Sequence, residues 1–307
     1  MTLVYDIAMR VRFRGQTRRQ GVLLHGPAGW GEFSPFPDYD ALTCARWLAA
    51  AREAADDGWP APVRDLVPVN TTVPAVGPEQ AHAMVRASGC TTAKVKVAEA
   101  GQSLADDVAR VEAVRDALGR AGRVRVDANA AWSLDEATIA LRTLGKFDLE
   151  YAEQPVASLD DMAALRRRVD TPLAADESVR RAEDPLHIAG LEAADIVVLK
   201  VQPIGGVRRC LEVAEACGLP VVVSSAIETS VGIAAGVALA AALPELPYAC
   251  GLGTVPLLDA DVTSDPLLPV GGFLPVRNVA PDPSLVNASD EVRVHWLARM
   301  QAAADAA

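Results

Sequence analysis

The stretch "TAKVKVAEAGQSLADDVARVEAVRDALGRAGRVRVDA", residues 92–128, contains one complete strand–helix–strand repeat. Each end is a short run in which valines alternate with charged residues, as in a β-strand. Between these runs lies an amphipathic segment, and Ser103 at its start is a favourable N-cap residue for a helix. Because two parallel strands need a crossover connection, usually a helix, the stretch predicts a βαβ unit.

The same alternation continues along most of the chain. Strand-like runs lie at 67–73, 92–97, 123–128, 149–154, 172–177, 195–201, 220–225 and 247–252. Helix-like segments lie between them at 78–88, 103–118, 133–144, 158–168, 183–190, 207–217 and 230–242. Eight strands at a nearly constant spacing favour a closed α/β barrel of the TIM-like (βα)7β type. A doubly wound sheet is the alternative, but it usually has a glycine-rich phosphate turn after its first strand, and "VNTTVPAVGPE" is not one.

The two ends of the chain do not share this rhythm. Residues 1–68 contain strand-like runs with glycine turns and a helix-like segment at 43–55, which together predict a small α+β domain. Residues 256–307 are proline-rich and then helical. We therefore expect an α+β domain at 1–68, the barrel at 69–255, and a C-terminal segment at 256–307 that returns to the first domain.

Charge and composition limit the classes of partner. The net charge is −11, and no basic stripe is present to neutralise phosphates, which argues against nucleic acid. The five cysteines form no C-x-x-C pair and predict buried thiols in a reducing compartment. The N-terminus lacks an apolar signal segment, and the apolar run at 231–243 is too short to span a bilayer. We expect a cytoplasmic protein that acts on a small molecule, binds no membrane, and is compatible with a monomer.

Ionisable residues lie in or at the ends of successive strand-like runs. They are Lys94, Lys96, Asp127, Glu153, Asp176 and Lys200. One charged residue after a strand is usually a solvated loop residue. Six of them at successive strand ends predict a shared site, because the carboxyl ends of barrel strands meet on one rim and hold the catalytic groups.

The chemistry of this set favours a metal ion and a lysine base. Three adjacent carboxylates repel one another unless a cation lies among them, and oxygen ligands favour Mg²⁺ or Mn²⁺. A lysine base working near neutral pH needs its pKa lowered by roughly 3 units, or about 4 kcal/mol. Lys94 shares one strand face with Lys96 and supplies a like charge that lowers the pKa of Lys96.

Several motifs together resemble the enolase superfamily, in its muconate-lactonising branch. They are "KVK" (94–96), "RVDANAAW" (125–132), "EQP" (153–155), "ADES" (175–178), "LKVQPIGG" (199–206) and "GWGEFSPFP" (29–37). The resemblance covers nearly the whole chain. It implies that residues 1–68 form a capping domain, completed by the C-terminal segment. Members of this superfamily use a lysine or histidine base together with Mg²⁺.

The resemblance also implies a role for each site residue. Asp127, Glu153 and Asp176 would be the metal ligands. Lys96 would remove the proton α to a carboxylate, and Lys200 would stabilise the resulting enediolate. Further contacts to the substrate would come from Lys94, Arg125, Asn129, Ser224, Ser225 and Gly251.

Two segments narrow the activity that the resemblance implies. "SSAIETSVG" (224–232) and "CGLGT" (250–254) are similar to those of branch members that dehydrate 2-succinyl-6-hydroxy-2,4-cyclohexadiene-1-carboxylate to 2-succinylbenzoate in menaquinone biosynthesis. The alternative is an N-acylamino acid racemase or dipeptide epimerase of the same superfamily, with Lys96 and Lys200 as bases on opposite faces of the α-carbon. A metal-binding barrel without catalytic activity is a third interpretation.

Overall fold

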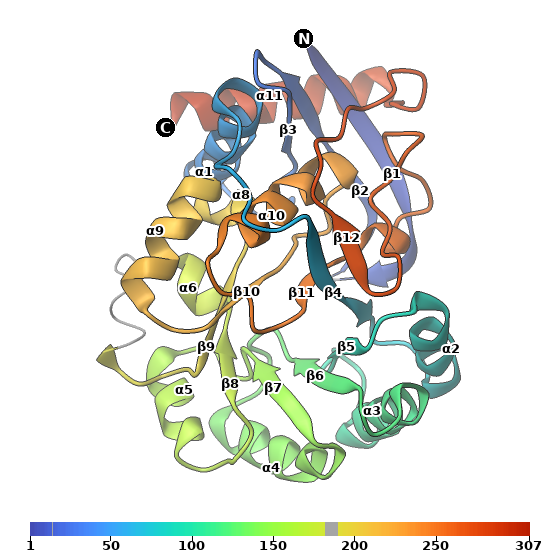
Figure 1. Ribbon diagram of the computed structural model, residues 1–307, viewed down its shortest axis with the longest axis vertical. Helices are drawn as coiled ribbons and strands as arrows, with labels where there is room; N and C mark the ends of the chain where they lie inside the picture. The colour runs from blue at the N-terminus through green and yellow to red at the C-terminus, as the bar shows by residue number, and fades with distance from the viewer. Residues whose placement is uncertain (14, 182–189) are drawn as a thin grey trace.

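The computed structural model describes residues 1–13, 15–181 and 190–307. Figure 1 shows an antiparallel sheet and the C-terminal helix α11 (Asp290–Asp305) at one end of the molecule. The helices that follow the first barrel strands lie at the other end. The predicted helix at 183–190 lies outside the described residues, apart from its last residue.

The antiparallel sheet forms the core of the N-terminal cap. Its strands are β1 (Thr2–Phe13), β2 (Gln16–His25) and β3 (Trp30–Phe33), which pair in chain order, and α1 (Ala41–Arg52) follows. Helix α11 packs against α1, β1 and β2. The buried Trp296 of α11 donates its indole N–H to Gln20 at 3.0 Å and meets the Phe33 ring edge-on. The C-terminal helix is therefore part of the cap.

Eight parallel strands form the barrel. They are β4 (Leu66–Val73), β5 (Thr92–Lys96), β6 (Arg123–Asp127), β7 (Leu149–Glu153), β8 (Leu173–Ala175), β9 (Ile196–Leu199), β10 (Val221–Val223) and β11 (Cys250–Gly253). Strands β4 to β10 pair in chain order, and β11 pairs with β4. A bridge between Ser224 and Gly251 joins β10 to β11 and closes the ring. The predicted α/β fold, a TIM-like (βα)7β barrel with a cap, is confirmed.

Helices connect the strands and cover the barrel. They are α2 (Pro78–Ser88), α3 (Leu104–Leu118), α4 (Leu134–Leu144), α5 (Leu159–Arg166), α6 (Glu177–Arg181), α8 (Val201–Ile204), α9 (Val207–Cys217) and α10 (Ser230–Ala242). Ser103, Ser133 and Ser158 cap α3, α4 and α5, since each side chain accepts the backbone N–H three residues later. The short turns are η1 (Glu53–Asp57), η2 (Gly145–Phe147) and η3 (Val255–Leu257), and a short strand β12 (Phe273–Pro275) pairs with β4.

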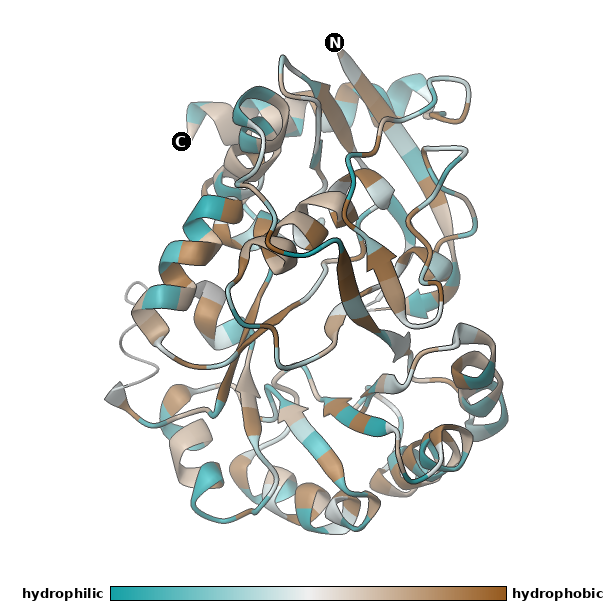
Figure 2. Ribbon diagram, viewed as in Figure 1, coloured by the Kyte–Doolittle hydropathy of each residue, from teal (hydrophilic) through white to brown (hydrophobic). Residues whose placement is uncertain are grey.

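The barrel interior is not uniformly apolar. Strands β9 and β10 contain only buried aliphatic residues, as expected for parallel strands covered on both faces. In β6 and β7, by contrast, hydrophilic bands interrupt the hydrophobic colouring (Figure 2). Arg125, Asp127 and Glu153 are the buried charged residues of these two strands. Buried charges are costly unless they are paired, so their partners identify the part of the barrel that carries chemistry.

Within the described ranges, no helix has both the length and the apolar character needed to cross a membrane. All five cysteine side chains are buried, as the sequence predicts.

Cap and barrel meet through buried carboxylates. Glu32 of β3 accepts hydrogen bonds from the hydroxyls of Tyr5 and Ser34 and from the backbone N–H groups of Thr229 and Gly232. A carboxylate of the cap thus lies at the N-terminus of barrel helix α10, where the helix dipole favours negative charge. Glu228 lies beside it, and burial together with the charge of Glu32 raises the pKa of Glu228 to about 7.

This raised pKa predicts a pH-dependent loss of stability. The unfolded Glu228 side chain ionises near its ordinary pKa of 4.5 and the folded one near about 7, so the folded state keeps an extra proton between these values. Stability should fall as pH rises through that window, by about 2–3 kcal/mol. Glu228→Gln should remove this contribution. Urea unfolding of both proteins at pH 5 and pH 8 tests it, and parallel pH profiles would contradict the prediction.

Candidate active site

The pairing register brings the predicted residues to one rim. Lys96 of β5 pairs with Asp127 of β6, and Asp127 pairs in turn with Glu153 of β7. Asp176 directly follows β8, and Lys200 directly follows β9. All five lie at the carboxyl ends of consecutive strands, because parallel strands in register place equivalent positions side by side.

The charged groups are buried and paired. The Lys94 Nζ atom lies 2.8 Å and 2.9 Å from the two carboxylate oxygens of Glu153, and 3.3 Å from Asp127. The Lys96 Nζ atom lies 2.5 Å from Asp127. Lys200 forms an ion pair with Asp176. Each of the three carboxylates is thus paired with a lysine of a nearby strand. This pairing offsets the free-energy cost of removing the charges from water.

The two lysines of β5 differ in their proton affinity. Burial disfavours the charge of Lys94, but Glu153 and Asp127 outweigh it and hold the pKa of Lys94 well above its usual range. Burial lowers the pKa of Lys96, and the positive charge of Lys94 lowers it further, while Asp127 acts in the opposite direction. Lys94 is therefore a permanent cation, and Lys96 is the lysine of the pair that is easier to deprotonate.

The three carboxylates supply oxygen donors of the kind that a divalent cation binds. All are about 1 % exposed, and burial together with the charge of Asp127 raises the pKa of Glu153 to about 7. In contrast, Lys96 and Lys94 overcome the effect of burial on Asp127 and hold its pKa well below its usual range. In the described ranges, no three acidic, histidine or cysteine side chains lie close enough together to hold a metal ion, and Glu153 and Asp176 contact lysine ammonium groups. These hard oxygen donors, already in contact with cations, suit Mg²⁺ or a similar ion.

A narrow pocket opens above these charges. Its lining includes Lys94, Lys96, Asp127, Asn129, Lys200, Ser224, Ser225, Ala226, Ile227, Gly251 and Thr254, together with Phe13 and Phe36 of the cap. The cavity volume is about 30 Å³. This is room for about one water molecule, so a larger ligand must displace side chains that line it.

Most residues predicted to contact substrate line this pocket. Asn129 accepts a hydrogen bond from the Lys96 ammonium at 2.5 Å and donates one to Glu177. Ser225 exchanges a hydrogen bond with the Thr254 hydroxyl at 2.9 Å. A Cβ atom on Gly251 would lie 2.6 Å from the Ser224 Oγ atom, so glycine is required where the barrel closes.

Arg125 is an exception. Its guanidinium contacts Glu150, Asn70 and the carbonyl of Ala249, and it stacks on Tyr151. It does not line the pocket. Two residues along a strand is roughly 7 Å, so Arg125 lies one layer deeper in the barrel than Asp127. Although it shares a strand face with Asp127, Arg125 does not lie in the same layer, and its role as a substrate contact stays a prediction.

The sequence prediction did not name six residues of the pocket, which are Thr72, Phe13, Phe36, Ala226, Ile227 and Thr254. Thr72 of β4 pairs in register with Lys94 and lines the cavity. Its hydroxyl is buried and has no hydrogen-bond partner among the described residues. Phe13 places its ring 5.1 Å from the Lys96 Nζ atom, and Phe36 lies beside it in the lining. The strand end "NTTV" could have indicated Thr72, but no local pattern indicates which cap residues reach the barrel.

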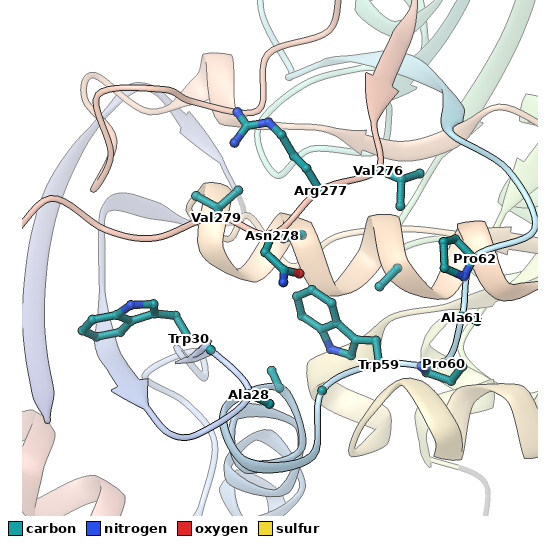
Figure 3. Close-up of a pocket in the computed structure, with 15 residues that line it drawn as sticks. Ala28, Trp30, Trp59, Pro60, Ala61, Pro62, Val276, Arg277, Asn278 and Val279 are labelled. Atoms are coloured by element: carbon teal, nitrogen blue, oxygen red, sulfur yellow. The ribbon is translucent and has the colours of Figure 1, made fainter.

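A larger cavity, of about 370 Å³, lies elsewhere (Figure 3). It is bounded by Trp30, Trp59, Ala234 and Asn278, among others. The Arg277 side chain points away from the Trp59 ring and pairs with Asp265. Its described lining residues include no carboxylate and no lysine, so it lacks groups for acid–base chemistry. The smaller pocket at the strand ends is the candidate active site.

Comparison with known families agrees with this geometry. Residues 78–281 match the enolase C-terminal domain-like family, and residues 4–55 match the enolase N-terminal domain-like family. The chain belongs to the enolase superfamily. Members of this superfamily use a divalent metal.

Individual relatives cover nearly the whole chain. It is 65 % identical to the o-succinylbenzoate synthase of Thermobifida fusca, over 97 % of this chain and 94 % of that protein. It is 53 % identical to the o-succinylbenzoate synthase of Mycolicibacterium smegmatis, over 95 % and 91 %. Among solved structures, the L-Ala-D/L-Glu epimerase of Bacillus subtilis is similar in fold, with a TM-score of 0.78 at 24 % identity over 92 % of this chain and 96 % of that one. The muconate lactonizing enzyme of Pseudomonas fluorescens has a TM-score of 0.77 at 23 % identity, over 96 % and 97 %.

The buried ion pairs predict how the metal-free protein responds to the loss of Lys94. Lys94→Met keeps the side-chain volume but leaves Glu153 and Asp127 without their shared cation. Breaking a buried pair in this way should destabilise the protein by about 3–5 kcal/mol in the presence of a chelator. The double variant Lys94→Met/Glu153→Gln should recover much of this loss. Urea unfolding measures both effects, and a single variant as stable as the wild type would contradict the pairing.

Proposed function

We propose that this protein is a carbon–oxygen lyase that dehydrates 2-succinyl-6-hydroxy-2,4-cyclohexadiene-1-carboxylate to 2-succinylbenzoate, a step of menaquinone biosynthesis. The activity is that of o-succinylbenzoate synthase, the name of the relatives that are 65 % and 53 % identical. The observation that carries the proposal is this identity over nearly the whole chain, combined with two lysines at the mouth of one pocket.

Lys96 is the proposed base. Burial and Lys94 lower its pKa, so a larger fraction of the amine is neutral at the working pH. The neutral Lys96 amine removes the proton α to the substrate carboxylate, and the electrons of the C–H bond pass into the carboxylate to form an enediolate. The protonated Lys96 then gives a proton to the departing hydroxyl group. The C–O bond breaks, water leaves, and the ring becomes aromatic.

Lys200 is the proposed electrostatic stabiliser. It follows β9, four strands away from β5, and reaches the same pocket. Its ammonium group remains positive while negative charge develops on the substrate carboxylate. Stabilisation of developing charge by a fixed group in a site closed to water is one of the largest contributions to catalysis.

Asp127, Glu153 and Asp176 are the proposed ligands of Mg²⁺, with Mn²⁺ as a possible substitute. When bound, the ion supplies Lewis-acid stabilisation of the substrate carboxylate. Lys94 and Lys200 contact these carboxylates in the structure, so the lysines keep the ligands in place and neutralise their charge. The pKa of Glu153 is raised to about 7, so this carboxyl group must lose its proton before it can bind the metal ion.

The remaining pocket residues are proposed to bind the substrate. Ser224, Ser225 and Gly251, where β10 meets β11, would contact the succinyl tail. Lys94 and Asn129 would act beside Lys96, and we add Thr72 because its buried hydroxyl is unpartnered among the described residues. Phe13 and Phe36 of the cap cover the pocket and exclude water from the reacting groups.

Racemisation or epimerisation of an N-acylamino acid or dipeptide is the second candidate. It is favoured by the placement of Lys96 and Lys200 around one pocket, since two such bases can exchange protons with opposite faces of an α-carbon. Dehydration needs one base used twice and one fixed cation. The two activities therefore make different demands on Lys200.

A direct assay separates the candidates. With Mg²⁺, the purified protein should convert the hydroxycyclohexadiene carboxylate to its aromatic product, followed by ultraviolet absorbance. Chelation should abolish turnover, and added Mg²⁺ should restore it. N-succinylamino acids assayed in parallel by polarimetry provide the comparison. Efficient racemisation without dehydration would replace the proposal with the second candidate, and full activity in chelated protein would exclude the metal.

Variants of the two lysines test their roles. Lys96→Ala should lower kcat by several orders of magnitude and abolish solvent deuterium exchange at the substrate α-carbon. Lys200→Arg keeps a cation that does not deprotonate in proteins, so part of the dehydration should survive while any racemisation disappears. Asn129→Ser serves as a milder control at the same rim. A near-normal rate for Lys96→Ala would remove Lys96 from the role of base.

Three further features remain proposals. We propose a cytoplasmic location and a monomer. We also propose the division into a capping domain at 1–68, a barrel at 69–255 and a C-terminal segment at 256–307. Size-exclusion chromatography with light scattering tests the oligomeric state.

A further inference from the structure

One wall of the active-site pocket has a strained backbone. Ile227 lines the cavity and has a φ of +63°, in the left-handed region that a β-branched side chain rarely adopts. It belongs to the loop 224–229, which connects β10 to α10. Such a conformation persists only where surrounding contacts hold it in place, and it often occurs at functional sites.

Arg19 of the cap supplies that contact. It lies on β2 and is 2 % exposed. Its Nε atom donates a hydrogen bond to the carbonyl of Ile227 at 2.9 Å, across the boundary between cap and barrel. Because the donor is charged, this hydrogen bond is stronger than one between neutral groups.

The same guanidinium also holds the opposite wall. A terminal nitrogen of Arg19 donates to the carbonyl of Ser34 at 2.7 Å. The Arg19 guanidinium carbon lies 4.8 Å from the centre of the Phe36 ring, in a cation–π arrangement. Phe36 lines the pocket from the cap, as Ile227 does from the barrel. One planar group therefore fixes the spacing between the two walls.

Other side-chain contacts hold two neighbours of Ile227 in the loop, Ala226 and Thr229. Glu228 accepts the backbone N–H of Ala226 at 2.7 Å, and Glu32 accepts that of Thr229 at 3.2 Å. Both contacts use backbone donors on either side of Ile227. The Ile227 carbonyl, at the strained position itself, is held by Arg19.

We infer that Arg19 is a positioning residue, which holds Ile227 and Phe36 at the separation that the substrate requires and so couples docking of the cap to substrate binding. This inference rests on the proposed dehydration only for its kinetic readout. Arg19 does not line the pocket and takes no part in proton transfer.

Arg19→Gln tests the inference, and Arg18→Gln is the matched control. Arg18 is its neighbour on β2, but it is exposed and pairs with Asp6 within the cap. Arg19→Gln should raise KM by about tenfold, the loss expected for a hydrogen bond made by a charged group. The value of kcat should change less, and the affinity for Mg²⁺, measured by calorimetry, should stay the same. A purely structural role would lower Tm without raising KM well below that temperature.

A double-variant cycle tests whether Arg19 acts through the strain at Ile227. Glycine and asparagine adopt positive φ with little cost, whereas valine keeps the β-branched strain. Arg19→Gln should therefore raise KM much less in an Ile227→Gly or Ile227→Asn background than in an Ile227→Val background. Equal effects in all three backgrounds would overturn the inference. If Arg19→Gln does not fold, Arg19→Lys replaces it in the same cycle. Lysine keeps the buried positive charge but lacks the planar guanidinium that donates to two carbonyls.

Hydrogen exchange provides a readout that does not depend on the substrate. Peptides that cover residues 224–229 should exchange faster in Arg19→Gln than in the wild type or Arg18→Gln. If the wild type fails to dehydrate the diene but this difference is present, the proposed function is wrong and the positioning role stands. Unchanged exchange of this loop, with unchanged KM, would overturn the positioning role.

Discussion

The register between parallel strands β5, β6 and β7 is the constraint on which the site depends. It places Lys96, Asp127 and Glu153 side by side on adjacent strands, and the two carboxylates are nearly inaccessible to water. A shift of one residue in either pairing would turn a charged side chain from the barrel interior toward the helices. The same register that assembles the site therefore also keeps its charges paired, and unpaired charges at this depth would cost several kcal/mol each.

The paired charges show how one rim could hold both the proposed base and the proposed metal ligands. Lys94 is a fixed cation because two carboxylates surround it, and its charge in turn lowers the pKa of Lys96. Lys94 and Lys96 lie two positions apart on one strand, yet they differ in proton affinity because their neighbours differ. The proposed base and the cation beside it therefore both come from strand β5.

The pocket belongs to both parts of the molecule. The barrel provides the charged rim, while Phe13 and Phe36 of the cap also line the pocket. Glu32 and Arg19 extend from the cap to the loop that leads into α10. Solved epimerase and lactonizing structures share this fold at 22–24 % identity. Because one fold can carry different functions, differences in substrate are expected to come from the residues that line the pocket.

The sequence by itself determined the elements and their order. The alternation of valine-rich runs and amphipathic segments gave the predicted helix at 78–88, which is the observed α2 (Pro78–Ser88), and the predicted strand at 67–73, close to β4 (Leu66–Val73). The N-cap serines could also be predicted from the sequence, because helix capping depends on residues within one turn. The charged strand ends could be predicted as well, because an ionisable residue stands out in an otherwise hydrophobic run.

Only the tertiary structure decided the rest, because the deciding contacts join residues far apart in the chain. The depth of Arg125 in the barrel depends on where its strand starts relative to its neighbours, which side-chain alternation does not reveal. At the closure of the barrel, Gly251 lies so close to the Ser224 side chain that a Cβ atom on residue 251 would crowd it. The link from Arg19 to Ile227 spans the boundary between cap and barrel. Local sequence encodes helices, strands and caps through short-range sterics and hydrogen bonds, whereas the shape of the pocket arises from packing between elements that no local pattern records.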